Sequence, residues 1–263
     1  MAVISKGGSL RMHDDGYGLP AGVIRVWFAD LRGLGARLAD LRALLSHDEL
    51  DRAERFTMER LTNRFILRRG LLRVVLGRCT GRDPAGLRFE YGAHGKPALA
   101  GGGPSFNLAD SEDSVAIALA ADGRIGVDIE RLRPIESADG ISDRFFHPLE
   151  CAALNALPPD QRNEGFLLGW TRKEAFIKAA GVGLSMPLDQ FAVTVTPGDP
   201  VAVLAVDESL RADAGPPDDW SLFDRRVLPD TIAAVAARGT GWRVDCRLVD
   251  DGLFSRTPLT DRS

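Results

Sequence analysis

The chain has 263 residues, of which 44% are hydrophobic, enough to bury the core of one large domain or two small ones. Its 33 Lys and Arg against 37 Asp and Glu give a net charge of −4, so it lacks the basic excess that binds a nucleic-acid backbone. The longest apolar run, residues 115–121, is far shorter than the roughly 20 residues of a membrane-spanning helix, so neither nucleic acid nor a membrane is an expected partner.

The first 22 residues are rich in glycine and polar side chains and have no hydrophobic period, which predicts a disordered tail. Polar residues such as His13 and Asp14 stand where an export signal needs an unbroken apolar core, so we expect a cytosolic protein. The three cysteines are widely spaced and odd in number, which favours reduced thiols over a disulfide framework.

Ordered structure is expected to begin near Val23. Residues 23–31 alternate as in a strand, and Ser46 with Glu49 three positions later forms a capping box that starts a helix. Residues 61–76 carry apolar side chains at helical spacing. The arginines of this helix are expected to form a solvated face: Arg64, Arg68, Arg69 and Arg73. Four strands are predicted after it, at residues 87–91, 105–108, 114–120 and 124–130.

The second half repeats this order of elements. Residues 147–157 and 164–180 read as helices, and the later one ends at Gly181 and Gly183, which tolerate a positive φ. Five more strands are predicted, at residues 190–196, 201–206, 220–227, 231–237 and 242–248. The pattern is α+β and suggests two similar halves, which we place at residues 23–122 and 123–263.

The segment G-V-D-I-E at residues 126–130 lies on a predicted strand. A strand has a period of two residues, so Asp128 and Glu130 share one face. Two adjacent carboxylates repel unless a cation lies between them, and oxygen ligands of this kind suit Mg²⁺. A solvated strand face explains the same two residues, and it is the more frequent case for this short pattern.

Helical spacing places Trp170, Glu174 and Lys178 on one face of the predicted helix 164–180. Taken alone, Glu174 and Lys178 are an ordinary surface pair, worth about 0.3 to 0.5 kcal/mol. If this helix meets the strand with Asp128 and Glu130, the three carboxylates form a Mg²⁺ site, and Lys178 provides a positive charge for a phosphate.

Together these segments resemble the 4'-phosphopantetheinyl transferases of the larger, two-lobed surfactin type. The resemblance rests on four segments in the family's order and spacing: G-K-P at 95–97, F-N-L at 106–108, G-V-D-I-E at 126–130, and W-T-R-K-E-A-F-I-K-A-A-G-V-G-L at 170–184. It implies two pseudo-symmetric α+β lobes with the site between them. It also implies transfer of the phosphopantetheine arm of coenzyme A to a serine of an apo carrier protein, with release of adenosine 3',5'-bisphosphate, by a monomer.

The resemblance also implies roles for individual residues. The ligands of Mg²⁺ fall on Asp128, Glu130 and Glu174, and we expect Glu174 to take the serine proton while Lys178 stabilises the departing bisphosphate. Contacts with coenzyme A are expected at six positions: Arg52, Arg64, Lys96, Asn107, Asp110 and Lys178.

Two positions depart from the family. After F-N-L the family has Ser-His, whereas this chain has Ala109 and Asp110, which puts an anion near a phosphate at a cost of on the order of 1 to 4 kcal/mol. Either Asp110 turns away, or an arginine bridges it to the phosphate, or coenzyme A binds less tightly. The other position is Glu49, where relatives have a lysine; we interpret Glu49 as part of the capping box, and Arg52 compensates one turn on.

Two further hypotheses follow. Ala109 and Asp110 are also compatible with a catalytically impaired relative that binds coenzyme A or carrier proteins without transfer. A magnesium-dependent phosphohydrolase would share the three acids, although it does not explain the segments at 95–97 and 170–184.

Overall fold

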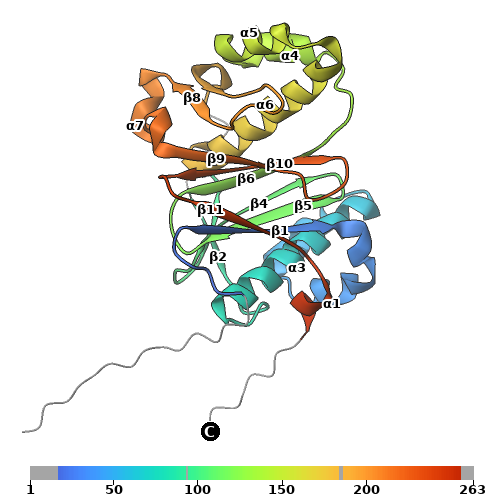
Figure 1. Cartoon of the computed structure of the whole chain (residues 1–263). Coiled ribbons are helices and arrows are strands. Elements are labelled where there is room, and N and C mark those ends of the chain that lie inside the picture. The colour runs from blue at the N-terminus through green and yellow to red at the C-terminus, as the bar shows by residue number, and fades with distance from the viewer. Residues whose placement is uncertain (1–16, 93, 184–185, 256–263) are drawn as a thin grey trace, which may run out of the picture.

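The structure, a computed structural model, describes residues 17–92, 94–183 and 186–255. They form four layers, in which two β-sheets face each other and each sheet carries helices on its outer side (Figure 1). The first sheet has the order β11-β1-β5-β4, with β1 at Val23–Asp30, β4 at Ser105–Ser111, β5 at Ser114–Ala120 and β11 at Arg243–Leu248. The second has the order β6-β10-β9, with β6 at Ile125–Arg131, β10 at Thr231–Arg238 and β9 at Trp220–Arg225. The prediction of an α+β fold is confirmed.

The remaining elements complete the two halves. Two small hairpins pair β2 (Phe89–Tyr91) with β3 (Pro97–Leu99) and β7 (Phe191–Val193) with β8 (Val203–Val206). The helices are α1 (Leu38–Arg42), α2 (His47–Glu54), α3 (Glu59–Thr80), α4 (Ala138–Phe145), α5 (Pro148–Ala156), α6 (Pro159–Ala180) and α7 (Arg211–Ala214).

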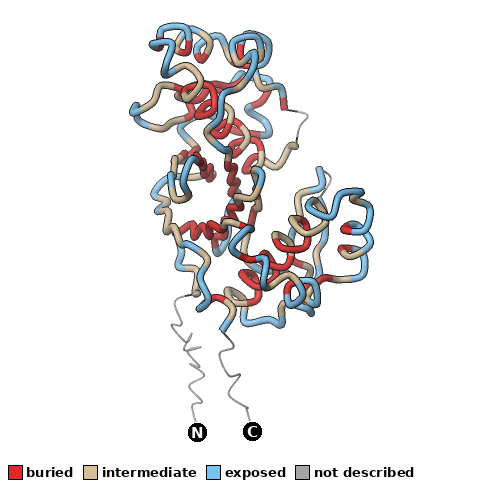
Figure 2. The backbone as a smooth tube through the Cα atoms, turned by 90° about the vertical axis from the view of Figure 1, so that its right-hand side faces the viewer, coloured by how far each residue is buried: buried red, intermediate tan, exposed pale blue. Residues whose placement is uncertain are grey.

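The core between the sheets is built from small and β-branched residues. It joins alternate residues of β5, among them Ala116 and Ala118, to Val127 of β6 and Ala233 of β10. Small side chains let the two sheets approach closely, since sheets pack face to face through interdigitating side chains. Figure 2 shows the buried residues concentrated in the middle of the molecule and the exposed ones along its outer loops and helices.

The two long helices have matching places in the two halves. α3 packs on the outer face of the first sheet and α6 on that of the second, and each has 22 residues. Each ends at a glycine in the left-handed conformation, Gly81 with φ 67° and Gly181 with φ 76°, where a side chain would be strained. This equivalence gives the fold its pseudo-symmetry.

The last strand departs from the predicted division of the chain. We expected residues 123–263 to form one half, but β11 pairs in parallel with β1, Val23 opposite Arg243, and so belongs to the sheet of the first half. Leu253 also packs into the core beneath α3. A strand pattern specifies which side chains face a core, not which strand lies beside it, so this pairing was not predictable.

Ordered structure also begins earlier than expected. Tyr17 and Leu19, which we predicted to be part of a tail, pack against the core of the first half. Residues 1–16 of the predicted tail lie outside the described residues. In the described part of the chain, no helix combines the length and the apolar character needed to cross a membrane.

Candidate functional site

The site is built where α6 lies against β6. A Cβ atom on Gly126 would overlap the carbonyl oxygen of Ala175 and stand 2.5 Å from the backbone nitrogen of Ala179. Only glycine therefore allows this approach of helix and strand. The two-residue period of β6 puts Asp128 and Glu130 on the face that Gly126 presents to α6.

Asp128 is the most perturbed carboxylate of this region. Lys178 Nζ donates to its Oδ1 at 2.6 Å, and its Oδ2 is buried without a hydrogen-bond partner. Burial raises the pKa of Asp128 to about 7, a rise that Lys178 opposes and that the nearby charges of Glu130 and Glu174 add to. An acidic group with one unsatisfied oxygen, close to two further carboxylates, is suited to hold a cation.

The exposure of α6 confirms the face expected from helical spacing. Trp170, Glu174 and Lys178 are half-buried positions in a stretch of the helix that is otherwise buried. Glu130 is held from the other half of the molecule, because Ser111 Oγ at the end of β4 donates to its Oε2 at 2.9 Å. Residues of both halves therefore contribute to the site.

The donor set fits a hard divalent cation. Asp128, Glu130 and Glu174 supply only carboxylate oxygens, which Mg²⁺ prefers, and the buried Oδ2 of Asp128 has no hydrogen-bond partner. Within the described residues, however, no three His, Cys, Asp or Glu side chains are gathered closely enough to hold a metal ion as they stand. Lys178 provides the positive charge beside Asp128.

Two expected coenzyme A contacts tie the halves together. Lys96 Nζ donates to the carbonyl oxygens of Ile125 at 2.8 Å and Lys178 at 2.7 Å, and burial with the nearby charge of Arg124 lowers its pKa to about 8. Asn107 Oδ1 accepts from the backbone nitrogen of Val127 at 2.8 Å. The segments G-K-P and F-N-L thus both fasten the first half to β6, a role that the sequence did not predict.

The other expected contacts lie on and around α3. The guanidinium groups of Arg52 and Arg68 both lie near the ring of Phe65, at 5.5 and 5.4 Å from its centroid. Arg68 also pairs with the carboxylate of Asp110, which supplies the arginine that a bridge from Asp110 to a phosphate would need. Arg64 lies apart from them, because its Nε donates to Asp113 Oδ1 at 2.6 Å in the β4–β5 turn.

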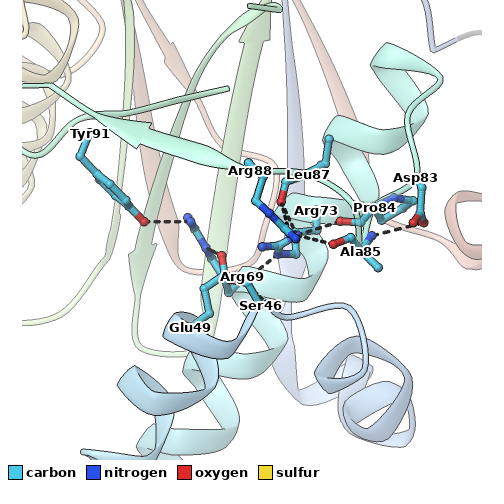
Figure 3. Close-up of polar contacts among 10 residues, drawn as sticks. All are labelled: Ser46, Glu49, Arg69, Arg73, Asp83, Pro84, Ala85, Leu87, Arg88 and Tyr91. Carbon is cyan, nitrogen blue, oxygen red and sulfur yellow. Dashed lines mark hydrogen bonds and ion pairs between the residues drawn. The ribbon is translucent and has the colours of Figure 1, made fainter. Parts of the chain in front are cut away.

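The arginines of α3 correct a prediction (Figure 3). Arg69 and Arg73, expected on a solvated face, both pair with Glu49, and only 1% of the Arg73 side chain is exposed. Burial alone raises the pKa of Glu49, but the two arginines outweigh it, so its net pKa lies below the usual value. The predicted capping box of Ser46 and Glu49 is present, and Arg69 Nη2 also donates to the hydroxyl of Tyr91 at 3.1 Å.

A second buried ion pair was missed by the sequence analysis. Lys173 Nζ lies 2.8 and 2.7 Å from the two carboxylate oxygens of Glu150 and donates to the carbonyl oxygen of Phe191 at 2.6 Å. Burial raises the pKa of Glu150 and lowers that of Lys173. The available signal was the place of Lys173 on the apolar side of α6, where an unpaired charge is costly.

The chain is similar to known 4'-phosphopantetheinyl transferases. Residues 124–229, which include β6, α6 and β9, match the model of the 4'-phosphopantetheinyl transferase superfamily. The chain is 36% identical over 226 residues to 4'-phosphopantetheinyl transferase HetI of Nostoc sp. (strain PCC 7120), covering 84% of this chain and 90% of that protein. It is 34% identical over 152 residues to 4'-phosphopantetheinyl transferase Sfp of Bacillus subtilis (strain 168), covering 57% and 66%.

A solved structure described as a Chronobacterium ammoniagenes ACPS-CoA complex aligns at 21% identity and a TM-score of 0.33, over 45% of this chain and 98% of that chain. The similarity to HetI spans nearly the whole of that protein at more than a third identity. The chain therefore belongs to the 4'-phosphopantetheinyl transferase family.

Proposed function

We propose that the protein transfers the 4'-phosphopantetheine arm of coenzyme A to a serine hydroxyl of an apo carrier protein and releases adenosine 3',5'-bisphosphate. Membership of the family supports this reaction class. The observation that carries the proposal for the site is Asp128, whose buried, unpartnered Oδ2 lies beside Lys178 and near Glu130 and Glu174.

Asp128, Glu130 and Glu174 are the residues that would hold Mg²⁺. When bound, the ion neutralises the charge of the pyrophosphate and orients it for attack. The pKa of about 7 at Asp128 supports this assignment, because a positive charge is needed there to keep the carboxylate ionised at neutral pH.

Two side chains of the protein accept the serine proton and stabilise the negative charge of the leaving group. The serine oxygen bonds to the β-phosphorus while the bond from that phosphorus to the bridging oxygen breaks. Glu174, half-exposed on α6, accepts the serine proton. Lys178, one turn further along and 29% exposed, moves its ammonium from Asp128 to the departing bisphosphate.

Coenzyme A binding is proposed at the six positions named from the resemblance. Of these, Arg52 offers a guanidinium group near the ring of Phe65 for a phosphate, and Arg68, which the resemblance did not name, lies near the same ring. Arg64 is paired with Asp113 and lies apart from them. Lys96 uses two of its three N–H groups on carbonyl oxygens, which leaves one for a phosphate. Asn107, Asp110 and Lys178 complete the proposed set.

The alternative of a catalytically impaired relative rests on Asp110. Because Arg68 pairs with this carboxylate, its charge is already compensated before any phosphate binds. A magnesium-dependent phosphohydrolase is the third hypothesis, since it would use the same three carboxylates, Asp128, Glu130 and Glu174. We further propose that the protein acts as a monomer in the cytosol, where its three free cysteines stay reduced.

Intact-mass spectrometry of several apo carrier proteins, incubated with this protein, coenzyme A and Mg²⁺, tests the proposal. A gain of about 340 Da, the mass of one phosphopantetheine arm, that EDTA prevents is the expected result. No gain on any carrier while coenzyme A still binds would favour the impaired relative. Release of the bisphosphate without a carrier protein would favour the phosphohydrolase.

A further inference from the structure

Two aspartates on the outer strands of the second sheet lie on one row. Ala234 of the central strand β10 is opposite Asp128 of β6 on one side and opposite Asp224 of β9 on the other. Residues directly opposite each other in a ladder point to the same face of a sheet. Both carboxylates therefore meet α6, Asp128 through Lys178 and Asp224 through Arg172.

The two ion pairs differ in how completely they are satisfied. Arg172 is 1% exposed, and its guanidinium donates from Nε to Asp224 Oδ1 at 3.0 Å, from Nη2 to Asp224 Oδ2 and from Nη1 to the carbonyl oxygen of Thr194. Asp128, in contrast, accepts from Lys178 at Oδ1, and its Oδ2 has no hydrogen-bond partner. Both carboxylate oxygens of Asp224 are therefore hydrogen-bonded, whereas Asp128 keeps one free oxygen with which it can bind another partner.

α6 reaches from β6 to β9 between the two ion pairs. The rise from residue 172 to residue 178 is about 9 Å along a helix, and two inter-strand spacings are about 9.5 Å. Between the two pairs the helix meets the sheet through small residues, Ala175 on α6 and Ala234 on β10, both fully buried. Glu174 lies between the two ion pairs along the helix.

We propose that Arg172 is a positioning residue for Glu174, an inference that rests on the proposed function. The bidentate pair of Arg172 with Asp224 fixes the depth and rotation of α6 on the sheet. Glu174 then keeps its place when Lys178 leaves Asp128 for a phosphate or when a cation takes the open oxygen. A flat guanidinium fork is suited to this task, because two parallel hydrogen bonds set direction as well as distance.

The test uses a double variant that removes the pair without leaving a buried charge, Arg172→Met with Asp224→Asn. Arg172→Lys is the second variant, because it keeps the charge and loses the fork. The matched control is Glu164→Gln, which breaks the pair of Arg226 with the same helix at a half-exposed position away from the row. Three quantities are measured: the kcat and KM for coenzyme A, the dissociation constant of Mn²⁺ from the protein alone by electron paramagnetic resonance, and the unfolding midpoint.

The double variant is expected to stay folded, with kcat reduced at least tenfold, KM for coenzyme A within twofold of wild type, and Mn²⁺ bound several-fold more weakly. Arg172→Lys is expected between the double variant and wild type, and Glu164→Gln at wild-type values. Wild-type Mn²⁺ affinity in both Arg172 variants, or a loss of kcat that only follows the loss of folded protein, overturns the inference. If wild type transfers nothing to any carrier, the proposed function fails, and the Mn²⁺ comparison alone decides the inference.

Discussion

The guanidinium of Arg68 on α3 is paired with the carboxylate of Asp110 near the end of β4. Asp110 stands at the position where the family resemblance leads us to expect a histidine. Both side chains are partly exposed, 25% and 31%, so the pair is open to an incoming anion. Arg68 therefore compensates the charge of Asp110, and Asp110 in turn reduces the attraction of Arg68 for a phosphate.

Asp110→Asn is expected to tighten binding of coenzyme A by roughly three- to tenfold, because it removes a negative charge and frees Arg68. Arg68→Gln is expected to weaken binding by a similar factor. Calorimetric titration with coenzyme A at low and moderate salt measures both. Unchanged or weaker binding by the Asp110 variant would show that this pair lies outside the phosphate site.

Replacing the proposed base by its amide is expected to remove transfer and preserve the fold. Glu174→Gln keeps the shape and removes the proton acceptor, so kcat should fall by about 10²- to 10⁴-fold. Single-turnover transfer followed by intact mass gives the rate, and circular dichroism reports the fold. Near-normal turnover by this variant would contradict the assignment of Glu174 as the base.

Because Gly126 lies so close to the backbone of Ala175, adding one methyl group at this position should destabilise the protein. Gly126→Ala has to push α6 away from β6, which costs about 1 to 3 kcal/mol of unfolding free energy and lowers transfer, because Asp128 and Glu174 move apart. Gly140→Ala is the control. Gly140 lies in α4, where an added Cβ would meet no heavy atom within 4 Å beyond the neighbouring backbone, so this variant should be neutral or slightly stabilising. Urea unfolding compares the two, and equal midpoints would refute the close packing.

The buried pair of Lys173 with Glu150 predicts non-additive stability. Lys173→Met leaves a buried carboxylate without its partner and should cost about 3 to 5 kcal/mol at pH 8. Because burial raises the pKa of Glu150, this carboxylate takes up a proton as the pH falls, so the deficit should shrink toward pH 5. Adding Glu150→Leu should restore part of the lost stability. Chemical unfolding at both pH values measures this, and additive losses would be the contrary result.

The lowered pKa of Lys96 predicts that the folded protein becomes more stable between about pH 8 and pH 10.5. Burial lowers its pKa from 10.5 to about 8, so between these values the unfolded chain binds more protons than the folded one. The unfolding free energy of wild type should therefore increase relative to Lys96→Met as the pH rises from 8 to 10.5, by on the order of 3 kcal/mol. Below pH 8 the difference should be constant. A difference that stays the same across the whole range would show that Lys96 is not buried as a cation.

Local patterns predicted the elements well. The strand at Ser114–Ala120 and the capping box of Ser46 and Glu49 are present as expected, because both depend on residues close together in the sequence. α6 begins earlier than predicted, at Pro159, since a proline in the first turn starts a helix without the apolar spacing that the prediction relied on. The stripe of Trp170, Glu174 and Lys178 follows from helical periodicity alone.

The tertiary structure decided which residues far apart in the sequence contact each other. The sequence by itself determined the α+β class, the shared face of Asp128 and Glu130, and the family resemblance, because each depends on residue type and short spacing. The tertiary structure decided the pairing of β11 with β1, the burial of Arg73 against Glu49, and the bridge from Arg68 to Asp110. These contacts join distant segments, and a charged side chain is buried only where a partner from another element compensates its desolvation.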